Sequence, residues 1–425
     1  MATDPTLART LRGIELAGTK SLRKKGDLWL VPSASGNGTY VVDPRDNTCT
    51  CPDHEEHQVR CKHSYAVEYK LTHETDSSGA TIVTEEIKVT RKTYTQDWPN
   101  YNAALTTERK VVPELLRSLV DGLHVEPKQR KRGTQPMPLR EVVYAGLMRT
   151  FYGLSARRAE GDLKLLEQRG LLTKVPAYNT ILRYMALPEV TTKLEVLLAE
   201  SARPLTVLED PDTFSYGADA TGFSTSILGR YFEDKHGKRS EDGKPIATKR
   251  RKYIKAHAMC GTRTHVVTGL IVTDGSANDA PYLPALLDAT KRIGFRVDTV
   301  VADKGYLSDA NYRAIEAAGA AGYIPFKVNS TGQGSPIVQK MYGLYVYKRP
   351  EFLAAYHQRS NVETVFSMVK RRFGESLLSK DETPQKNELL CKFICHNACV
   401  LVKSIHTLGL APEFWPTSVR EGVAS

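Results

Sequence analysis

The chain has 425 residues, of which 41% are hydrophobic and 25% charged, a composition typical of globular proteins with several domains. Lys and Arg outnumber Asp and Glu by 59 to 48, a net charge of +11 that favours an anionic partner such as nucleic acid. No apolar run reaches the ~18 residues that a membrane-spanning helix needs. The N-terminus also lacks the apolar core of a signal peptide, so we expect a cytoplasmic protein that contacts no membrane.

The N-terminal half is predicted to contain a small module, a linker and a helical region. Short strands and turns are predicted in residues 28–75, within a module of residues 1–75. Residues 76–105 are polar with weak periodicity, which predicts a linker with one strand pair at most. Residues 106–205 show repeated helical patterns that begin at Pro or Ser and end at Gly. We expect this helical region to bind DNA.

From residue 206 the pattern changes to strands with interleaved helices, which indicates an α/β domain over residues 206–405. Ser308 is the expected N-cap of one of these helices. A basic insertion at 230–255 interrupts the early strands, and a tail of residues 406–425 follows the last helix.

Four soft metal ligands lie within fifteen residues of the N-terminal module. The pattern is Cys49-x-Cys51, nine residues, then Cys61-x-His63, which supplies the three thiols and one imidazole of a tetrahedral Zn²⁺ site. Since all four positions are filled by protein, the expected zinc ion is structural. Incidental buried cysteines are the alternative, and the spacing alone leaves His54 and His57 as further ligands.

This pattern resembles the SWIM zinc finger, whose form is Cys-x-Cys, a variable loop and Cys-x-His. The resemblance covers roughly residues 28–70, includes the preceding strand and turn "GTYVVDPRDNT", and selects Cys49, Cys51, Cys61 and His63. It implies binding to DNA or to protein and does not distinguish the two.

Three acidic residues are notable for their context. Asp219 follows an alternating strand pattern, Asp303 ends the apolar run "VVA" before a Lys-Gly turn, and Glu363 lies on a predicted helix. Each alone is more often a cap or a surface charge. Together, two strand-borne aspartates and a helix-borne glutamate are the hard oxygen ligands of a two-metal phosphoryl-transfer site with Mg²⁺.

The segment "AYHQRSNVETVFSMVK" is predicted to be one helix with a polar stripe beside an apolar one. At about 100° per residue, Tyr356, Arg359, Glu363 and Lys370 share a narrow face. On this segment alone the stripe is equally explained by solvated charge pairs at helical spacing. Beside the three acids, Tyr356, Arg359 and Lys370 are expected to hold the DNA strand being cut, and the two cations are expected to neutralise its phosphates.

Residues 206–405 resemble the catalytic domain of DDE transposases of the bacterial insertion-sequence type, which have a ribonuclease-H-like fold. The specific signature is Tyr-x2-Arg-x3-Glu-x6-Lys, and the segments "GADATGF", "VVADKGYLSDANYRAI", "SANDAPYLPALL" and "NELLCKFICHN" also match. The resemblance implies that Asp219, Asp303 and Glu363 form the catalytic triad with two Mg²⁺ (or Mn²⁺) ions. It further implies a prokaryotic host and an expected homodimer in the DNA complex.

Further basic and helical segments are candidates for contact with double-stranded DNA. Residues 235–255 hold nine Lys or Arg and two acids, and the expected phosphate contacts there are Lys249, Arg250, Arg251 and Lys252. A flexible solvated loop is the alternative. Residues 128–133 are either a basic arm or a linker. Two helices could form a helix-turn-helix that presents Tyr178, Asn179, Thr180 and Arg183 to bases.

Three cysteines, Cys391, Cys395 and Cys399, share one helical face and are expected to pack in the core instead of binding a metal. The resemblance to DDE transposases implies that the protein binds terminal inverted repeats, cleaves DNA and transfers 3′-OH ends into target DNA. Two alternatives stay open: a ribonuclease-H-like nuclease without strand transfer, and a transposase-derived DNA-binding protein.

Overall fold

The structure described is a computed structural model; the residues it describes are 5–34, 36, 38–72, 74–75, 81–82, 97–126, 135–225, 253–327 and 329–415. The chain divides into two compact units, each built from two separate stretches of sequence. The first unit comprises Met1–Arg91 and Phe326–Ala355, and the second comprises Lys92–Pro325 and Tyr356–Ser425. The four candidate zinc ligands therefore share a unit with Phe326–Ala355, a segment that lies between Asp303 and Glu363 in the sequence.

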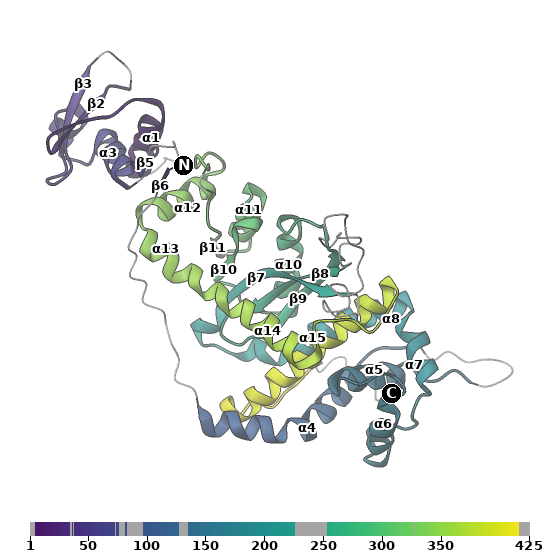
Figure 1. Ribbon diagram of the computed structural model, residues 1–425. Helices are drawn as coiled ribbons and strands as arrows, with labels where there is room; N and C mark the ends of the chain where they lie inside the picture. Colours follow the sequence, from purple (N-terminus) through teal and green to yellow (C-terminus); the bar gives the residue numbers. More distant parts are fainter. Residues whose placement is uncertain are drawn as a thin grey trace, which may run out of the picture. The chain divides into compact units, whose positions relative to one another are not determined.

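The first unit combines a small antiparallel sheet with helices (Figure 1). Its elements are α1 (Pro5–Thr19), β1 (Arg23–Lys25), β2 (Leu28–Pro32), β3 (Thr39–Asp43), β4 (Thr48–Cys49), α2 (Pro52–His57), α3 (Lys62–Thr72), β5 (Glu74–Thr75), β6 (Thr81–Ile82), α12 (Pro336–Tyr347) and α13 (Arg349–Tyr356). Strands β1 to β4 pair in chain order, and β5 pairs with β6. Helix α1 approaches α3 closely at Gly13, where an added Cβ would lie only 2.6 Å from Cβ of Tyr65.

Helix α12 belongs to this unit because its aromatic side chains contact the N-terminal helices. The Tyr347 hydroxyl donates to the backbone carbonyl of Thr10 at 3.4 Å, and the Tyr347 ring meets Tyr65 edge-on with 5.5 Å between centroids. Aromatic pairs in this arrangement contribute about 0.5–1.5 kcal/mol beyond their buried area. The fold of α12 is thus coupled to the helices that surround the zinc-ligand residues.

The second unit contains a helical layer that precedes the sheet in the sequence. Its helices are α4 (Trp98–Asp121), α5 (Leu139–Phe151), α6 (Ala159–Gln168), α7 (Tyr178–Met185), α8 (Pro188–Ala202) and, from the end of the chain, α15 (Glu382–Leu408). Helix α4 begins before residue 106, inside the expected linker, because Asp97 caps it by accepting a hydrogen bond from the Asn100 backbone N–H at 3.2 Å.

Helix α15 is the central support of this layer and packs against α4, α5 and α8 (Figure 1). By length and composition it is apolar enough to cross a membrane, but 78% of its most apolar window is buried inside the protein. Burial among other helices accounts for its apolar character. Cys391 and Cys395 are fully buried along it, and Cys399 is partly buried, which agrees with the predicted packing role.

The sheet of the second unit has five strands in the order β11-β10-β7-β8-β9. The strands are β7 (Ser215–Ser224), β8 (Tyr253–Gly261), β9 (Val267–Asp274), β10 (Thr299–Ala302) and β11 (Ala321–Tyr323). Strands β7, β8 and β9 are antiparallel neighbours, whereas β10 runs parallel to both β7 and β11. The remaining helices are α10 (Leu283–Ile293), α11 (Asp309–Ala317) and α14 (Ser360–Phe373), with short 3₁₀ turns at Arg203–Val207, Pro211–Phe214, Ala280–Tyr282, Lys304–Tyr306 and His357–Arg359.

Helices cover both faces of this sheet. An added Cβ at Gly217 would meet Val362 of α14, whereas one at Gly269 would meet Leu286 of α10. Gly269 pairs with Met259, which pairs with Ala218, so Gly269 and Ala218 point to the same face of the sheet. Gly217 points to the opposite face, because successive residues of a strand alternate between faces. Helices α14 and α10 therefore lie on opposite sides of the sheet. Ser308 caps α11 as predicted, since its hydroxyl accepts from the Asn311 N–H at 3.1 Å.

Candidate functional site

Three thiols and one imidazole meet in a buried cluster of the first unit. The Sγ atoms of Cys49, Cys51 and Cys61 and a ring nitrogen of His63 all lie within 4.8 Å of one another. His63 Nδ1 is 3.9 Å from Cys49 Sγ and 3.8 Å from Cys61 Sγ. Neighbouring ligands of a tetrahedral zinc ion lie roughly 3.6 Å apart, given ordinary Zn–S and Zn–N bond lengths. The donor set therefore fits Zn²⁺ with little rearrangement.

The thiols of this cluster differ in pKa. The Cys61 sulfur accepts a hydrogen bond from the Cys49 thiol, so the pKa of Cys61 lies below its ordinary value and the pKa of Cys49 lies above it. A thiolate is the form that binds a metal. His54 does not join the cluster, because its Nδ1 lies 2.8 Å from the Val59 carbonyl, and His57 is exposed outside it.

The first two acidic candidates lie on neighbouring parallel strands of the second unit. Asp219 lies within β7, and Asp303 directly follows β10. Because Ala302 pairs with Ala218, the two acids occupy the same level of the sheet. Each carboxylate also accepts a hydrogen bond from a nearby backbone N–H, at 2.8 Å for Asp219 and 2.6 Å for Asp303.

The third acidic candidate is joined to the first by an arginine. Glu363 lies in the first turn of α14. Arg359 Nη1 lies 3.0 Å from Asp219 Oδ2, and its Nη2 lies 2.5 Å from Glu363 Oε1. Charge-assisted hydrogen bonds of this kind are the stronger ones in proteins. Arg359 is therefore the positive charge that holds these two carboxylates together in the described structure.

The electrostatic environment of Asp219 shows that all three acids influence one another. Burial, with smaller contributions from the negative charges of Asp303 and Glu363, raises the pKa of Asp219 to about 6, although the Ala220 N–H and Arg359 oppose the change. A buried carboxylate whose pKa is raised in this way is a common feature of functional sites. Positive charge placed beside Asp219 would therefore favour its ionised form.

Gly217 allows α14, the helix that carries Glu363, to approach the sheet closely. It lies on β7 two residues before Asp219, and an added Cβ there would come within 2.1 Å of Val362 Cγ2 and 3.3 Å of Val301 Cγ2. Since Val362 immediately precedes Glu363, this close contact sets the distance between α14 and the strand that carries Asp219.

The C-terminal half of α14 is also tied to β7. Lys370 Nζ donates to Thr221 Oγ1 at 2.7 Å and lies 5.2 Å from the centre of the Phe223 ring. Burial lowers the pKa of Lys370. In the described structure this lysine points at the strand, so a contact with DNA phosphate would require it to change partners.

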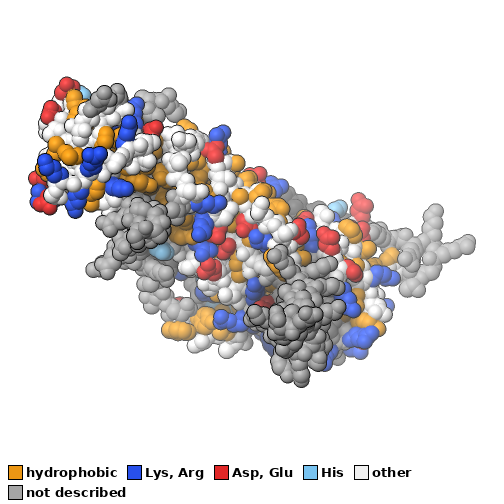
Figure 2. Space-filling model, turned by 45° about the horizontal axis from the view of Figure 1, so that its top comes forward, with side chains coloured by type: hydrophobic (Ala, Val, Ile, Leu, Met, Phe, Trp, Pro, Cys, Tyr) orange, Lys and Arg blue, Asp and Glu red, His pale blue; other side chains and the backbone are white. Residues whose placement is uncertain are grey.

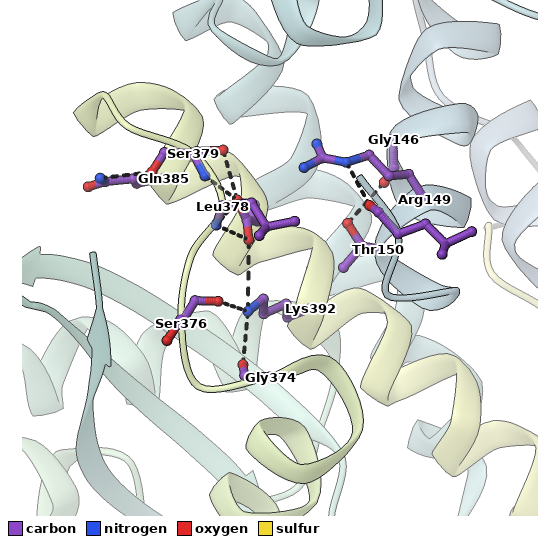
Figure 3. Close-up of polar contacts among 11 residues, drawn as sticks. Gly146, Arg149, Thr150, Gly374, Ser376, Leu378, Ser379, Gln385 and Lys392 are labelled. Carbon is purple, nitrogen blue, oxygen red and sulfur yellow. Dashed lines mark hydrogen bonds and ion pairs between the residues drawn. The ribbon is translucent and has the colours of Figure 1, made fainter. Parts of the chain in front are cut away.

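The connection from α14 to α15 is held by a buried ion pair (Figure 3). Lys392 Nζ donates to the backbone carbonyls of Gly374 and Ser376, each at 2.9 Å, and lies 3.8 Å from the Glu388 carboxylate. Glu388 in turn accepts from the backbone N–H groups of Leu378 and Ser379. The same connection pairs with the last residue of β7, where Leu377 N–H donates to the Ser224 carbonyl at 2.8 Å.

Sequence reasoning missed the roles of Glu388 and Lys392, although their signal was present. Both lie on a helix whose pattern is otherwise apolar, and Lys392 is only 2% exposed. Charged residues are rarely buried unless they are paired. The pair fixes the segment that follows α14 and so supports the helix that carries Glu363.

The predicted single helix with four polar residues is wrong in one respect. Helix α13 ends at Tyr356, a 3₁₀ turn covers His357–Arg359, and α14 begins at Ser360. The i→i+3 bonds of a 3₁₀ turn tighten the chain there, so Tyr356 and Arg359 precede the helix that bears Glu363 and Lys370. Tyr356 still lies beside the acids, because the Arg359 guanidinium is 5.9 Å from its ring centre.

Several predicted DNA contacts cannot be placed. Lys249, Arg250, Arg251 and Lys252 lie outside the described residues, as does the basic segment 128–133. Tyr178, Asn179, Thr180 and Arg183 lie on α7, which follows α6 after a connection of nine residues. That connection is longer than the tight turn of a standard helix-turn-helix.

Comparison with known proteins finds two family matches, each over a stretch that contains one of these clusters. Residues 218–398 match the family described as the Transposase DDE domain, and residues 36–71 match the SWIM zinc finger. A probable transposase for insertion sequence element ISA1214 of Archaeoglobus fulgidus is 26% identical over 318 residues, which cover 74% of this chain and 91% of that protein.

Among solved structures, a chain of the piggyBac transposase synaptic complex with hairpin DNA covers 75% of this chain and 79% of its own length. Its sequence identity is 11% and its TM-score is 0.36, too low to compare the folds in detail. The SWIM match and the Cys₃His cluster support zinc as the metal of the first unit. Residues 218–398 of this chain thus carry a transposase DDE domain, and a SWIM zinc finger precedes it at residues 36–71.

Proposed function

We propose that this protein is a transposase that binds the ends of an insertion sequence, cleaves DNA there and joins the freed 3′-OH ends to target DNA. The observation that carries the proposal is the convergence of Asp219, Asp303 and Glu363 at one level of the sheet, inside the stretch that matches the transposase domain. The homodimer expected in the DNA complex stays a prediction.

We also propose that the sheet and its helices form a ribonuclease-H-like fold. Three antiparallel strands, β7 to β9, are extended on the β7 side by two parallel strands, β10 and β11. The first acid lies on the central strand β7, the second follows β10, and the third comes from the helix on one face. This strand order and this placement of acids support the assignment.

The residues present fit divalent cations of the Mg²⁺ type. Asp219, Asp303 and Glu363 offer only carboxylate oxygens, the ligands that Mg²⁺ and Mn²⁺ prefer. The pKa of Asp219 is raised mainly by burial and also by the neighbouring acids, so a bound cation would stabilise its ionised form. Two bound ions would activate the attacking oxygen and stabilise the leaving oxygen of a phosphodiester.

The chain's own cations then have two roles. Arg359 neutralises Asp219 and Glu363 in the free protein, and its guanidinium is placed to bind a DNA phosphate when those carboxylates take other partners. Tyr356, whose pKa is raised by burial, packs beside Arg359 and can orient the same strand. Lys370 and the basic residues Lys249–Lys252 would add phosphate contacts that carry no sequence information.

The proposal is tested with DNA that contains the gene together with its flanks. Purified protein with Mg²⁺ or Mn²⁺ should cut this DNA at short inverted repeats on both sides of the gene. Glu363→Gln should reduce cleavage by about three orders of magnitude, since metal ligation contributes several kcal/mol to the transition state. DNA affinity should stay within a few-fold of the unaltered protein.

A matched control is Glu382→Gln, which removes the same charge from an exposed position in the first turn of α15. It should leave cleavage unchanged. Equal cleavage by the Glu363 variant and the control would reject the assignment of Glu363, and failure of the unaltered protein to cut would reject the proposed function.

A further inference from the structure

The first unit has a sheet edge that is almost purely basic. Strand β1 consists of Arg23, Lys24 and Lys25, and all three side chains are exposed. Lys20, also exposed, lies just before the strand, and no acidic residue interrupts the stretch from 20 to 25. On the face drawn in Figure 2, Lys and Arg side chains lie among acidic and hydrophobic ones.

This edge is open as well as charged. Among the residues that the structure describes, strand β1 pairs with β2 alone, through Arg23 with Leu30, Lys24 with Trp29 and Lys25 with Leu28, and it is the outermost strand of its sheet. Leu22, which precedes β1, and Trp29, which pairs with Lys24, are both buried in the core of this unit. Successive side chains of a strand point to opposite faces, so Arg23 and Lys25 share one face of this edge and Lys24 lies on the other.

The nearest acid in the sequence does not neutralise these cations. Asp27 follows the turn after β1, and its carboxylate pairs with Arg45 at 3.1 Å. Within the described residues, no ion pair joins β1 to any acid. An array of unpaired, ordered cations on an exposed strand has the charge complementary to a phosphate backbone.

We infer that β1 is a contact surface for the phosphate backbone of double-stranded DNA, and that the zinc-bearing unit adds sequence-independent affinity through Arg23, Lys24 and Lys25. This inference rests on the proposed function, because the DNA is the substrate of the same protein. The alternative is that these three basic residues only prevent the open sheet edge from pairing with other chains.

The test compares two triple variants with equal loss of charge. One variant changes Arg23, Lys24 and Lys25 to Gln. The control changes Arg296, Arg313 and Lys348 to Gln, which are equally exposed (64–68%) but already paired with adjacent carboxylates. The affinity of full-length, zinc-loaded protein for a 40-base-pair duplex of arbitrary sequence is measured by fluorescence anisotropy at several salt concentrations.

Each phosphate contact contributes roughly 0.9 to the slope of log affinity against log salt. The β1 variant should lower this slope by about 2 to 3, and the control should lower it by less than about 1. A charge-preserving variant, with Arg23→Lys, Lys24→Arg and Lys25→Arg, should restore the slope. Zinc content and circular dichroism should be the same in all variants.

An unchanged slope in the β1 variant would overturn the inference, as would self-association without a change in slope, which is the result expected for edge protection. A loss of affinity for duplex RNA but not for duplex DNA would also overturn it. Failure of the unaltered protein to bind any duplex would reject the proposed function instead, so the two failures are distinguishable.

Discussion

The two candidate metal centres of this protein differ in how complete they are before a metal binds. In the first unit, four soft ligands already lie within 4.8 Å of one another and are buried. In the second, three hard carboxylates are positioned by separate elements, and an arginine bridges two of them. A structural metal needs a closed set of protein ligands, whereas a reactive site must leave room for substrate.

The two centres also differ in how much they depend on the rest of the chain. The zinc ligands come from a continuous stretch of fifteen residues. The carboxylates are brought together by strand pairing, by the close approach of α14 at Gly217 and by the anchored segment after α14. Changes in the first unit should therefore act through zinc, and changes in the second through helix position and charge.

The largest expected effect comes from Cys61→Ser. Zinc binding supplies about 10–16 kcal/mol to small zinc-dependent folds, so loss of one ligand should release the ion and unfold the N-terminal module. Because α12 packs on the same unit, its amide hydrogen-exchange protection should fall as well. The second unit should keep its protection.

Metal analysis and hydrogen exchange check this prediction, with Cys399→Ser as a control outside the cluster. One zinc ion per chain in the Cys61 variant would show that the ligand set is wrong. Unchanged protection of α12 would show that it folds independently of the zinc cluster.

The next effect is a dependence of folding stability on pH, in the absence of Mg²⁺ and Mn²⁺. The pKa of Asp219 is about 6 in the folded chain, above its ordinary value of 3.8, so the folded state binds this proton more tightly. The stability from this group is full below about pH 4 and is lost as pH rises through about 6. A shift of two pKa units corresponds to about 3 kcal/mol.

Urea unfolding of zinc-loaded protein measures this dependence, and Asp219→Asn isolates it from other titrating groups. The variant should gain stability relative to the unaltered protein between pH 4 and pH 6. A constant difference between the two proteins over that range would contradict the assigned environment of Asp219.

A smaller effect should follow from Gly217→Ala. The added methyl group would clash with Val362, and overpacking of this kind costs about 1–3 kcal/mol. It should also displace Glu363 and slow cleavage. Adding Val362→Ala should restore part of both, because the smaller side chain makes room for the new methyl group.

Cleavage rates and unfolding free energies of the two single variants and the double variant form a complete cycle. Additive losses in the double variant would show that these two positions do not set the distance between α14 and β7.

How much of this could be predicted from the sequence differs between the two centres. The Cys₃His set was recognisable because its ligands are close in the chain, and the structure brings all four together. The three acids could be proposed from strand and helix patterns and from the family signature. Their catalytic roles stay a prediction, although the structure places them near one another.

Other features depend on tertiary packing and left little trace in the sequence. The bridging position of Arg359 depends on the turn that separates α13 from α14, which a helical periodicity does not reveal. Likewise, the segment Phe326–Ala355 joins the first unit through aromatic contacts with residues more than 280 positions away. Local patterns do not encode contacts at that separation.

The smallest expected effect comes from Arg359→Met. Arg359 competes with cations for Asp219 and Glu363, so its removal should strengthen Mn²⁺ binding to DNA-free protein by about tenfold, the value of one charge-assisted hydrogen bond. Electron paramagnetic resonance of free Mn²⁺ measures this affinity. Arg371→Met, at an exposed position on α14, is the control. Equal or weaker Mn²⁺ binding in the Arg359 variant would contradict the competition.

The central claim is that the three acids serve a transposase and not a simple nuclease. A labelled duplex that ends in the terminal repeat with a free 3′-OH is incubated with the protein, Mg²⁺ and a supercoiled plasmid. We predict that the label becomes covalently joined to the plasmid, and that Glu363→Gln abolishes the joining. Cleavage of DNA ends without any joined product would contradict the claim and favour a nuclease.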